Sequence, residues 1–144
     1  MKLNVKRAYM TLLLLLVFCS CITYHKSMEK YYSAVESHDY DKAIHKLNNN
    51  KFINRNRNQL LYYLEAGKMY RLKNDFETSN KYLNQADNYI ENSKKSVSDV
   101  IVGNLLNPMQ QAYRGEDFEQ FMLHFYKALN YSALGQTDEA VVEA

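Results

Sequence analysis

Apolar residues recur at helical spacing through much of the chain. Five of them lie three or four positions apart and share one face of a predicted helix: Leu60, Tyr63, Leu64, Gly67 and Tyr70. A second stripe follows at once and predicts another helix: Phe76, Leu83, Ala86 and Ile90. Between the stripes, Asn74 suits a left-handed helix end and Asp75 suits an N-cap. We therefore expect two antiparallel helices joined by a very short turn.

The pattern continues after an interruption. A long helix is predicted from Asp117, with Gln120 three positions on as in a capping box. It carries an apolar face that consists of Phe118, Met122, Phe125 and Leu129. Before it, the segment 100–108 suggests a short extra helix that stops at Asn107-Pro108. Four glycines and one proline in 144 residues also favour packed helices, so the expected fold class is all-α.

The two helices between residues 60 and 90 match a known repeat. The first reads Tyr63-x₂-Ala66-Gly67-x₂-Tyr70, and the second reads Ser79-x₃-Leu83-x₂-Ala86. This resembles the tetratricopeptide repeat, in which small residues allow close helix approach and large residues fill the space between hairpins. Weaker copies place Ala43 and Ala140 at the position of Ser79. Their spacings are 36 and 61 residues, against about 34 for a regular array.

The resemblance implies antiparallel helix hairpins stacked as an array over residues 28–144, with an insert near residues 92–117. The chain as a whole is similar to tetratricopeptide-type lipoproteins of Bacteroidetes-like bacteria. The last helix would have only about eight residues, whereas a terminal hairpin normally ends in a polar capping helix. We therefore expect a chain truncated at its C-terminus, either a piece of a longer protein or a shortened copy.

The first twenty residues have the organisation of a secretory signal. Residues 1–7 carry Lys2, Lys6 and Arg7, and residues 8–18 are apolar. This apolar stretch falls short of the roughly 20 residues needed to span a bilayer. Residues 1–20 are therefore predicted to be a signal peptide.

The end of that segment resembles the lipobox of bacterial lipoproteins. Ser20 precedes Cys21 as a small residue should, whereas Phe18 and Cys19 depart from the commoner residues. The resemblance implies lipidation of Cys21, and residues 21–27 are predicted to be a tether. The alternatives are a Cys19–Cys21 disulfide or metal pair, and an uncleaved signal anchor. Position 22 is not Asp, the inner-membrane retention residue of enterobacterial lipoproteins, so we expect anchoring to the outer membrane on its periplasmic side.

Charge gives no sign of a nucleic-acid partner. The whole chain has a formal charge of +2, but residues beyond 20 hold 15 basic and 16 acidic side chains. A nucleic-acid surface needs basic residues clustered on one face. The basic character therefore belongs to the targeting segment.

No catalytic, metal or cofactor site is predicted. The four histidines, His25, His38, His45 and His124, lack a metal-binding spacing. Glu116, Asp117 and Glu119 are interpreted as helix-start charges, which the helix dipole favours. No Gly-rich phosphate loop or Gly-x-Ser-x-Gly motif occurs. We therefore expect a protein that is not an enzyme.

The 13 tyrosines are the richest feature. Most should lie in the core, but one of each neighbouring pair can face a groove, and tyrosine is a good binding residue. The candidate groove residues are Tyr62, Lys68, Tyr70, Arg71 and Asn74. The leading hypothesis is a membrane-anchored scaffold that binds a protein or peptide. The alternatives are a structural subunit or spacer of an envelope complex, and a lipoprotein that binds a small ligand or glycan.

Overall fold

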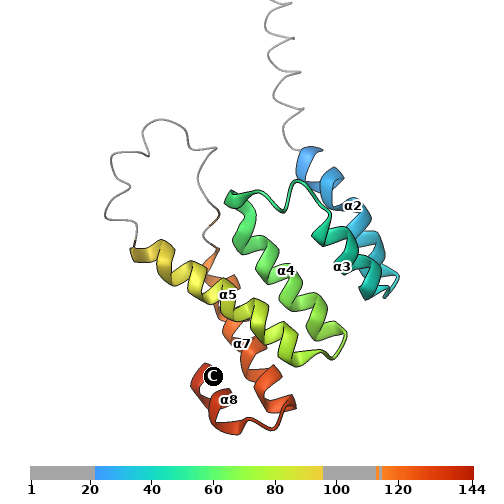
Figure 1. Cartoon of the computed structure of the whole chain (residues 1–144). Helices are drawn as coiled ribbons and strands as arrows, with labels where there is room; N and C mark the ends of the chain where they lie inside the picture. Colours follow the sequence, from blue (N-terminus) through green and yellow to red (C-terminus); the bar gives the residue numbers. More distant parts are fainter. Residues whose placement is uncertain (1–21, 96–112, 114) are drawn as a thin grey trace, which may run out of the picture.

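The computed structural model describes residues 22–95, 113 and 115–144, and this part of the chain is built from helices without strands. The α-helices and one short 3₁₀-helix are α2 (Ile22–Glu36), α3 (Tyr40–Asn48), η1 (Asn56–Asn58), α4 (Gln59–Leu72), α5 (Phe76–Lys95), α7 (Asp117–Ala133) and α8 (Thr137–Glu143). Each α-helix packs against the next one along the chain, so the helices follow one another as a row (Figure 1). The all-α prediction is confirmed for these residues.

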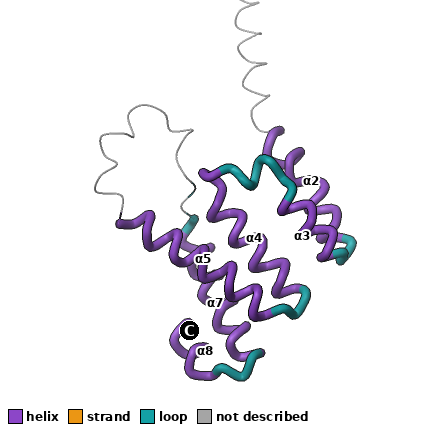
Figure 2. Tube along the Cα trace, viewed as in Figure 1, coloured by secondary structure: helices purple, strands orange, loops and turns teal. Residues whose placement is uncertain are grey.

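Three tight turns divide the helices into pairs: α2 with α3, α4 with α5, and α7 with α8 (Figure 2). Each turn contains one residue in the left-handed region, namely His38 (φ 58°), Asn74 (φ 60°) and Gly135 (φ 74°). In each turn the next residue's N–H bonds to the carbonyl five positions back, as Asp39 does to Ala34 at 3.0 Å. This is the Schellman arrangement, which satisfies the last carbonyls of a helix.

The turns also set a common numbering for the pairs. Residues of different pairs are called equivalent when they lie at the same distance along the chain from the left-handed residue. Ala43, Ser79 and Ala140 are equivalent in this sense, and all three are buried. Asp39 and Asp75 begin the second helices of their pairs by accepting backbone N–H bonds of 3.1 Å, from Lys42 and Thr78 respectively. The predicted roles of Asn74 and Asp75 are confirmed.

The core consists of two clusters that join neighbouring pairs. The first cluster lies between the first pair and α4, and its members are Met28, Tyr31, Ala34, Ala43, Leu47, Ile53, Ala66 and Met69. The second lies between the second pair and α7, and its members are Leu60, Leu83, Ala86, Ile90 and Leu123. Inside the second pair, a Cβ added at Gly67 would stand 2.7 Å from Leu83 Cδ2, so α4 and α5 approach closely there. Burial of these side chains is the main favourable contribution to folding.

Three boundaries differ from the prediction. Helix α2 begins at Ile22, so residues 22–27 are helical and not a free tether. The reason is tertiary: Ser27 Oγ donates to Asn50 Oδ1 at 3.2 Å, and Met28 is fully buried. The capping box of α7 is one residue earlier than predicted, because Glu116 N–H donates to Glu119 Oε2 at 2.8 Å. Helix α5 continues to Lys95 and takes in the first residues of the predicted insert.

The predicted signal peptide, Cys21 and most of the insert fall outside the described residues. Within the described part, none of the helices has the length and apolar character required to cross a bilayer.

The buried side of α7 is also not the one that its pattern suggests. The predicted apolar face is largely exposed, with Phe118 at 68% and Phe125 at 44% exposure. The residues of α7 that are buried are Leu123, Lys127 and Asn130. Two polar residues can occupy this side because neighbouring helices supply their partners, as described below.

Candidate binding surface

Two of the predicted groove residues, Tyr62 and Tyr70, lie in an aromatic row with Tyr82 of α5. The Tyr70 and Tyr82 rings stack at 5.4 Å, and Tyr62 meets Tyr82 edge-on at 6.0 Å. The Tyr62 hydroxyl donates to Asn48 Oδ1 at 3.0 Å. Burial, reinforced by Tyr82, raises the pKa of both Tyr62 and Tyr70. The row therefore packs α4 against α3 and α5. Tyr62 also lines a hollow of about 280 Å³ together with residues 53–56, Gln59 and Tyr63.

Arg71 and Asn74 also have structural roles. The Arg71 guanidinium donates to Asn130 Oδ1 of α7 and lies 5.8 and 5.7 Å from the ring centres of Phe76 and Tyr126. Arg71 thus joins the second pair to the third through the hydrogen bond to Asn130 and the cation–π contact with Tyr126, whereas its contact with Phe76 lies within the second pair. Asn74 is exposed and supplies the left-handed turn. These contacts do not test whether a partner binds at the five predicted residues, which stays a prediction.

Lys68 lines a different groove from Tyr62. A groove of about 180 Å³ runs between α4 and α7, and we call it the α4–α7 groove. Its residues are Leu61, Leu64, Glu65 and Lys68 of α4, Leu83 of α5, and Phe118, Glu119, Met122, Leu123 and Tyr126 of α7. Lys68 forms an ion pair with Glu65, which also accepts a 2.5 Å hydrogen bond from the Tyr31 hydroxyl of α2. The first helix of each pair therefore contributes to this side of the molecule.

The chemistry of the α4–α7 groove is suited to binding. Its floor is aliphatic and aromatic, and one positive and two negative side chains stand beside it. Apolar clefts with a few placed charges recognise peptide side chains. The lining contains no serine, cysteine or histidine that could act as a nucleophile or base.

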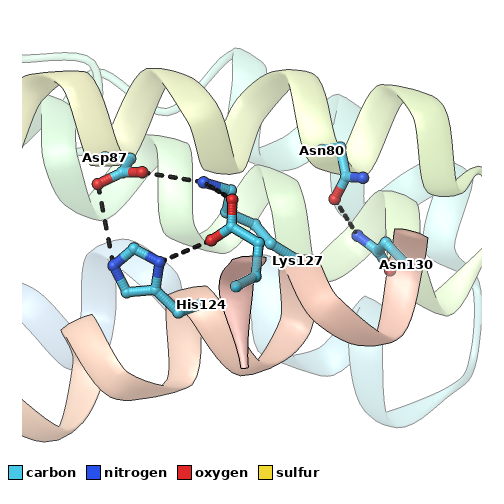
Figure 3. A network of polar contacts seen from close by, with 6 residues as sticks. Asn80, Asp87, His124, Lys127 and Asn130 are labelled. Carbon is cyan, nitrogen blue, oxygen red and sulfur yellow. Dashed lines mark hydrogen bonds and ion pairs between the residues drawn. The ribbon is translucent and has the colours of Figure 1, made fainter. Parts of the chain in front are cut away.

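A polar network that the sequence did not reveal holds α5, α7 and α8 together (Figure 3). The ammonium group of Lys127 donates to Asp87 Oδ2 at 2.9 Å and to Glu143 Oε1 at 2.6 Å. The His124 ring approaches the same two carboxylates, with Nδ1 2.7 Å from Glu143 Oε2. Lys127 is only 4% exposed. Its partners lie 40 and 16 positions away in the sequence, so no local signal could have identified the network.

This network is structural in character. Burial alone would lower the pKa of Lys127, but the hydrogen bonds that its ammonium group donates to Glu143 and Asp87 outweigh burial and raise the pKa. Lys127 therefore stays protonated at neutral pH, which prevents it from acting as a nucleophile or a base. The ammonium group instead neutralises two carboxylates that would repel each other.

Asn130 makes a second buried connection between the pairs (Figure 3). Its Nδ2 donates to Ser79 Oγ at 2.8 Å and to Asn80 Oδ1 at 2.9 Å. Ser79 Oγ in turn donates to the Gly67 carbonyl at 2.8 Å. The small side chain of Ser79 thus allows the close approach of α4 and α5 and also orients α7. Buried polar groups satisfied in this way fix one arrangement of the helices.

Comparisons of the chain with family models, with curated proteins and with solved structures find no match in any of the three. Function has to be inferred from the residues and their geometry.

Proposed function

We propose that this protein is a membrane-anchored lipoprotein of the cell envelope whose helix pairs form a tetratricopeptide-like array that binds a protein or peptide. The observation that carries the proposal is the α4–α7 groove, with its apolar floor and the Glu65–Lys68 ion pair. A repeat array presents such a surface on the first helices of its pairs without needing a catalytic group.

The repeat architecture is supported by the residues at the helix crossings. Ala43, Ser79 and Ala140 are buried at equivalent positions after three similar turns. Gly67 occupies the position where the repeat pattern has glycine, and its contact with Leu83 leaves no room for a side chain. These features favour repeated helix pairs over an irregular helical fold.

The anchoring is supported by the Ser20-Cys21 sequence after an apolar signal segment. Two or more acyl chains give stable membrane attachment. Because α2 begins at Ile22, lipidation of Cys21 would hold the array directly at the membrane surface. We expect that surface to be the periplasmic side of the outer membrane.

The test is chemical crosslinking in intact cells, followed by affinity capture and mass spectrometry. The wild type is compared with Cys21→Ala, with Lys68→Glu and with Phe118→Glu, both of which alter the α4–α7 groove. Phe121→Glu is the matched control, because Phe118 and Phe121 lie on the same helix and each is 68% exposed. We expect one reproducible partner that Phe121→Glu retains, that both groove variants lose, and that Cys21→Ala diminishes.

Metabolic labelling with an alkyne fatty acid tests the anchor separately. Label that disappears in Cys21→Ala and persists in Cys19→Ala is the expected result. A partner that both groove variants capture as well as the wild type would contradict the binding proposal, whatever the labelling shows.

A further inference from the structure

A second apolar surface covers the outer side of α7 and α8. Its exposed residues are Phe121, Phe125 and Leu129 of α7 and Val141 and Val142 of α8, and we call it the α7–α8 face. Phe121 is 68% and Val142 is 84% exposed. These residues line an open hollow of about 680 Å³. Contiguous exposed apolar patches of this kind mark interaction sites.

Equivalent positions in the second pair are covered by a helix. Leu60 is equivalent to Phe121 and is fully buried in the cluster that contains Leu123 of α7. Asn80 is equivalent to Val141, is 5% exposed, and bonds to Asn130 of α7. The second pair therefore uses these positions to receive α7.

The first pair uses the same positions to receive α4. Met28 is equivalent to Phe125 and is fully buried, and Ile44 is equivalent to Val141. Both pack in the cluster that contains Ala66 and Met69 of α4. Two pairs thus each bind the following helix on one face, and among the described residues no helix covers that face of the third pair.

We propose that the α7–α8 face binds an amphipathic helix of another protein, in the place that α7 occupies on the second pair. The hollow between α7 and α8 and the α4–α7 groove share no lining residue, so the α7–α8 face is a second site and does not depend on the first. Helices bind such grooves through apolar residues at i, i+3, i+4 and i+7.

The charge of residues 115–144 indicates which kind of partner helix would bind the α7–α8 face. Residues 115–144 contain six acidic side chains, Glu116, Asp117, Glu119, Asp138, Glu139 and Glu143, against the single basic residue Lys127. Of these, Asp138 and Glu139 are exposed on α8, and Lys127 is already paired. A helix whose apolar stripe is flanked by lysine or arginine is therefore the complementary partner.

The same charges disfavour a second copy of this chain. Two α7–α8 faces placed together would bring like charges into contact. A head-to-tail contact would use the outer side of α2, where the residues equivalent to Leu123, Lys127 and Asn130 are the exposed Lys26, Lys30 and Ser33. Those polar side chains offer no apolar stripe to cover Phe121 and Phe125.

The probe is a synthetic 18-residue helix with leucine on one face and lysine on the other. It is titrated by fluorescence anisotropy against the full chain in neutral phospholipid nanodiscs, with empty nanodiscs as the lipid control. We expect saturable binding to the wild type and no saturable binding to empty discs. Replacing every lysine of the probe by glutamate should weaken binding roughly tenfold or more.

Variants locate the site. Phe121→Glu and Val142→Glu should each weaken binding roughly tenfold or more, because each places a charge in the apolar contact. Leu72→Glu is the control and should bind within about twofold of the wild type, because Leu72 is 43% exposed on α4 and lines neither hollow. Since the substituted residues are exposed, the variants should keep the wild-type circular dichroism spectrum and unfolding midpoint.

Three results would overturn the proposal. One is equal binding of a scrambled probe that has the same composition but no apolar stripe. Another is equal loss of binding in Leu72→Glu and Phe121→Glu. The third is a dimer in sedimentation that Phe121→Glu dissociates, since a second copy would then occupy the face.

Discussion

The equivalent faces of the second and third helix pairs differ in burial. Leu60 of the second pair is fully buried beneath α7, whereas Phe121 at the equivalent position of the third pair is 68% exposed. Asn80 and Val141 differ in the same way, at 5% and 71% exposure. The position in the repeat therefore does not determine burial; the presence of a following helix does.

The outer side of α2 extends this comparison to the other end of the row. It carries Lys26, Lys30 and Ser33, all exposed, where α4 and α7 carry residues that pack on the preceding pair. A polar surface of this kind can remain in water. The two ends thus have opposite chemistry, and only the α7–α8 face has apolar area to gain by binding.

The largest expected effect comes from truncating Leu60, the buried residue of the Leu60–Phe121 comparison. Leu60→Ala should lower the free energy of unfolding by about 2–5 kcal/mol, because it removes a fully buried side chain and leaves a cavity. Phe121→Ala should change it by less than about 0.5 kcal/mol. Urea unfolding monitored by circular dichroism measures both. A loss in Phe121→Ala comparable to that in Leu60→Ala would show that the α7–α8 face is already covered.

The network around Lys127 offers the next test. Lys127→Met should lower the free energy of unfolding by about 1–3 kcal/mol, since Asp87 and Glu143 lose the ammonium group that separates them. Lys30 is equivalent to Lys127 but is exposed, so Lys30→Met should have an effect below about 0.5 kcal/mol. The same urea measurement applies. Equal effects at both positions would contradict a structural role for the network.

Gly67→Ala tests the helix crossing through the sign of its effect. In an exposed helix this change stabilises by about 1 kcal/mol through helix propensity. Here the new Cβ would lie 2.7 Å from Leu83 Cδ2, and Leu83 is itself buried. We expect a net destabilisation of about 1–2 kcal/mol from overpacking. An increase in the thermal midpoint would show that the helices can separate at no cost.

The smallest expected effect is a loss of stability in alkali. The pKa of Lys127, and those of Tyr62, Tyr70 and Tyr113, are raised above the ordinary values of 10.5 and 10.0. Each group binds its proton more tightly in the folded state, so its contribution is complete below the unfolded pKa and decreases as pH rises through the folded pKa. The urea midpoint should stay level up to about pH 9 and fall above pH 10. The urea midpoint of Lys127→Met should fall less steeply with pH than that of the wild type. An identical slope would contradict a contribution of Lys127 to the loss of stability in alkali.

Much of the local structure could be predicted because its causes are local. Asn74 and Gly135 end helices in the left-handed region, and Asp75 caps the next helix through a neighbouring N–H. The resemblance to the repeat placed small residues at Ala43, Ser79 and Ala140, and all three are buried. The left-handed conformation of His38 was missed, because histidine carries a weaker preference for it than asparagine or glycine.

Tertiary structure alone decided which side of each helix is buried and which residues meet. The stripe Phe118, Met122, Phe125 and Leu129 is the stronger apolar pattern of α7, yet Lys127 and Asn130 lie in the interior because Asp87, Glu143, Ser79 and Asn80 satisfy them. Long-range contacts also decide the roles of the predicted groove residues. Arg71 bonds to Asn130 and Tyr62 bonds to Asn48, whereas Lys68 lines the α4–α7 groove. The sequence by itself determined where helices begin, turn and end, since those choices depend on neighbours along the chain; which faces stay open depends on partners that the fold brings from far away.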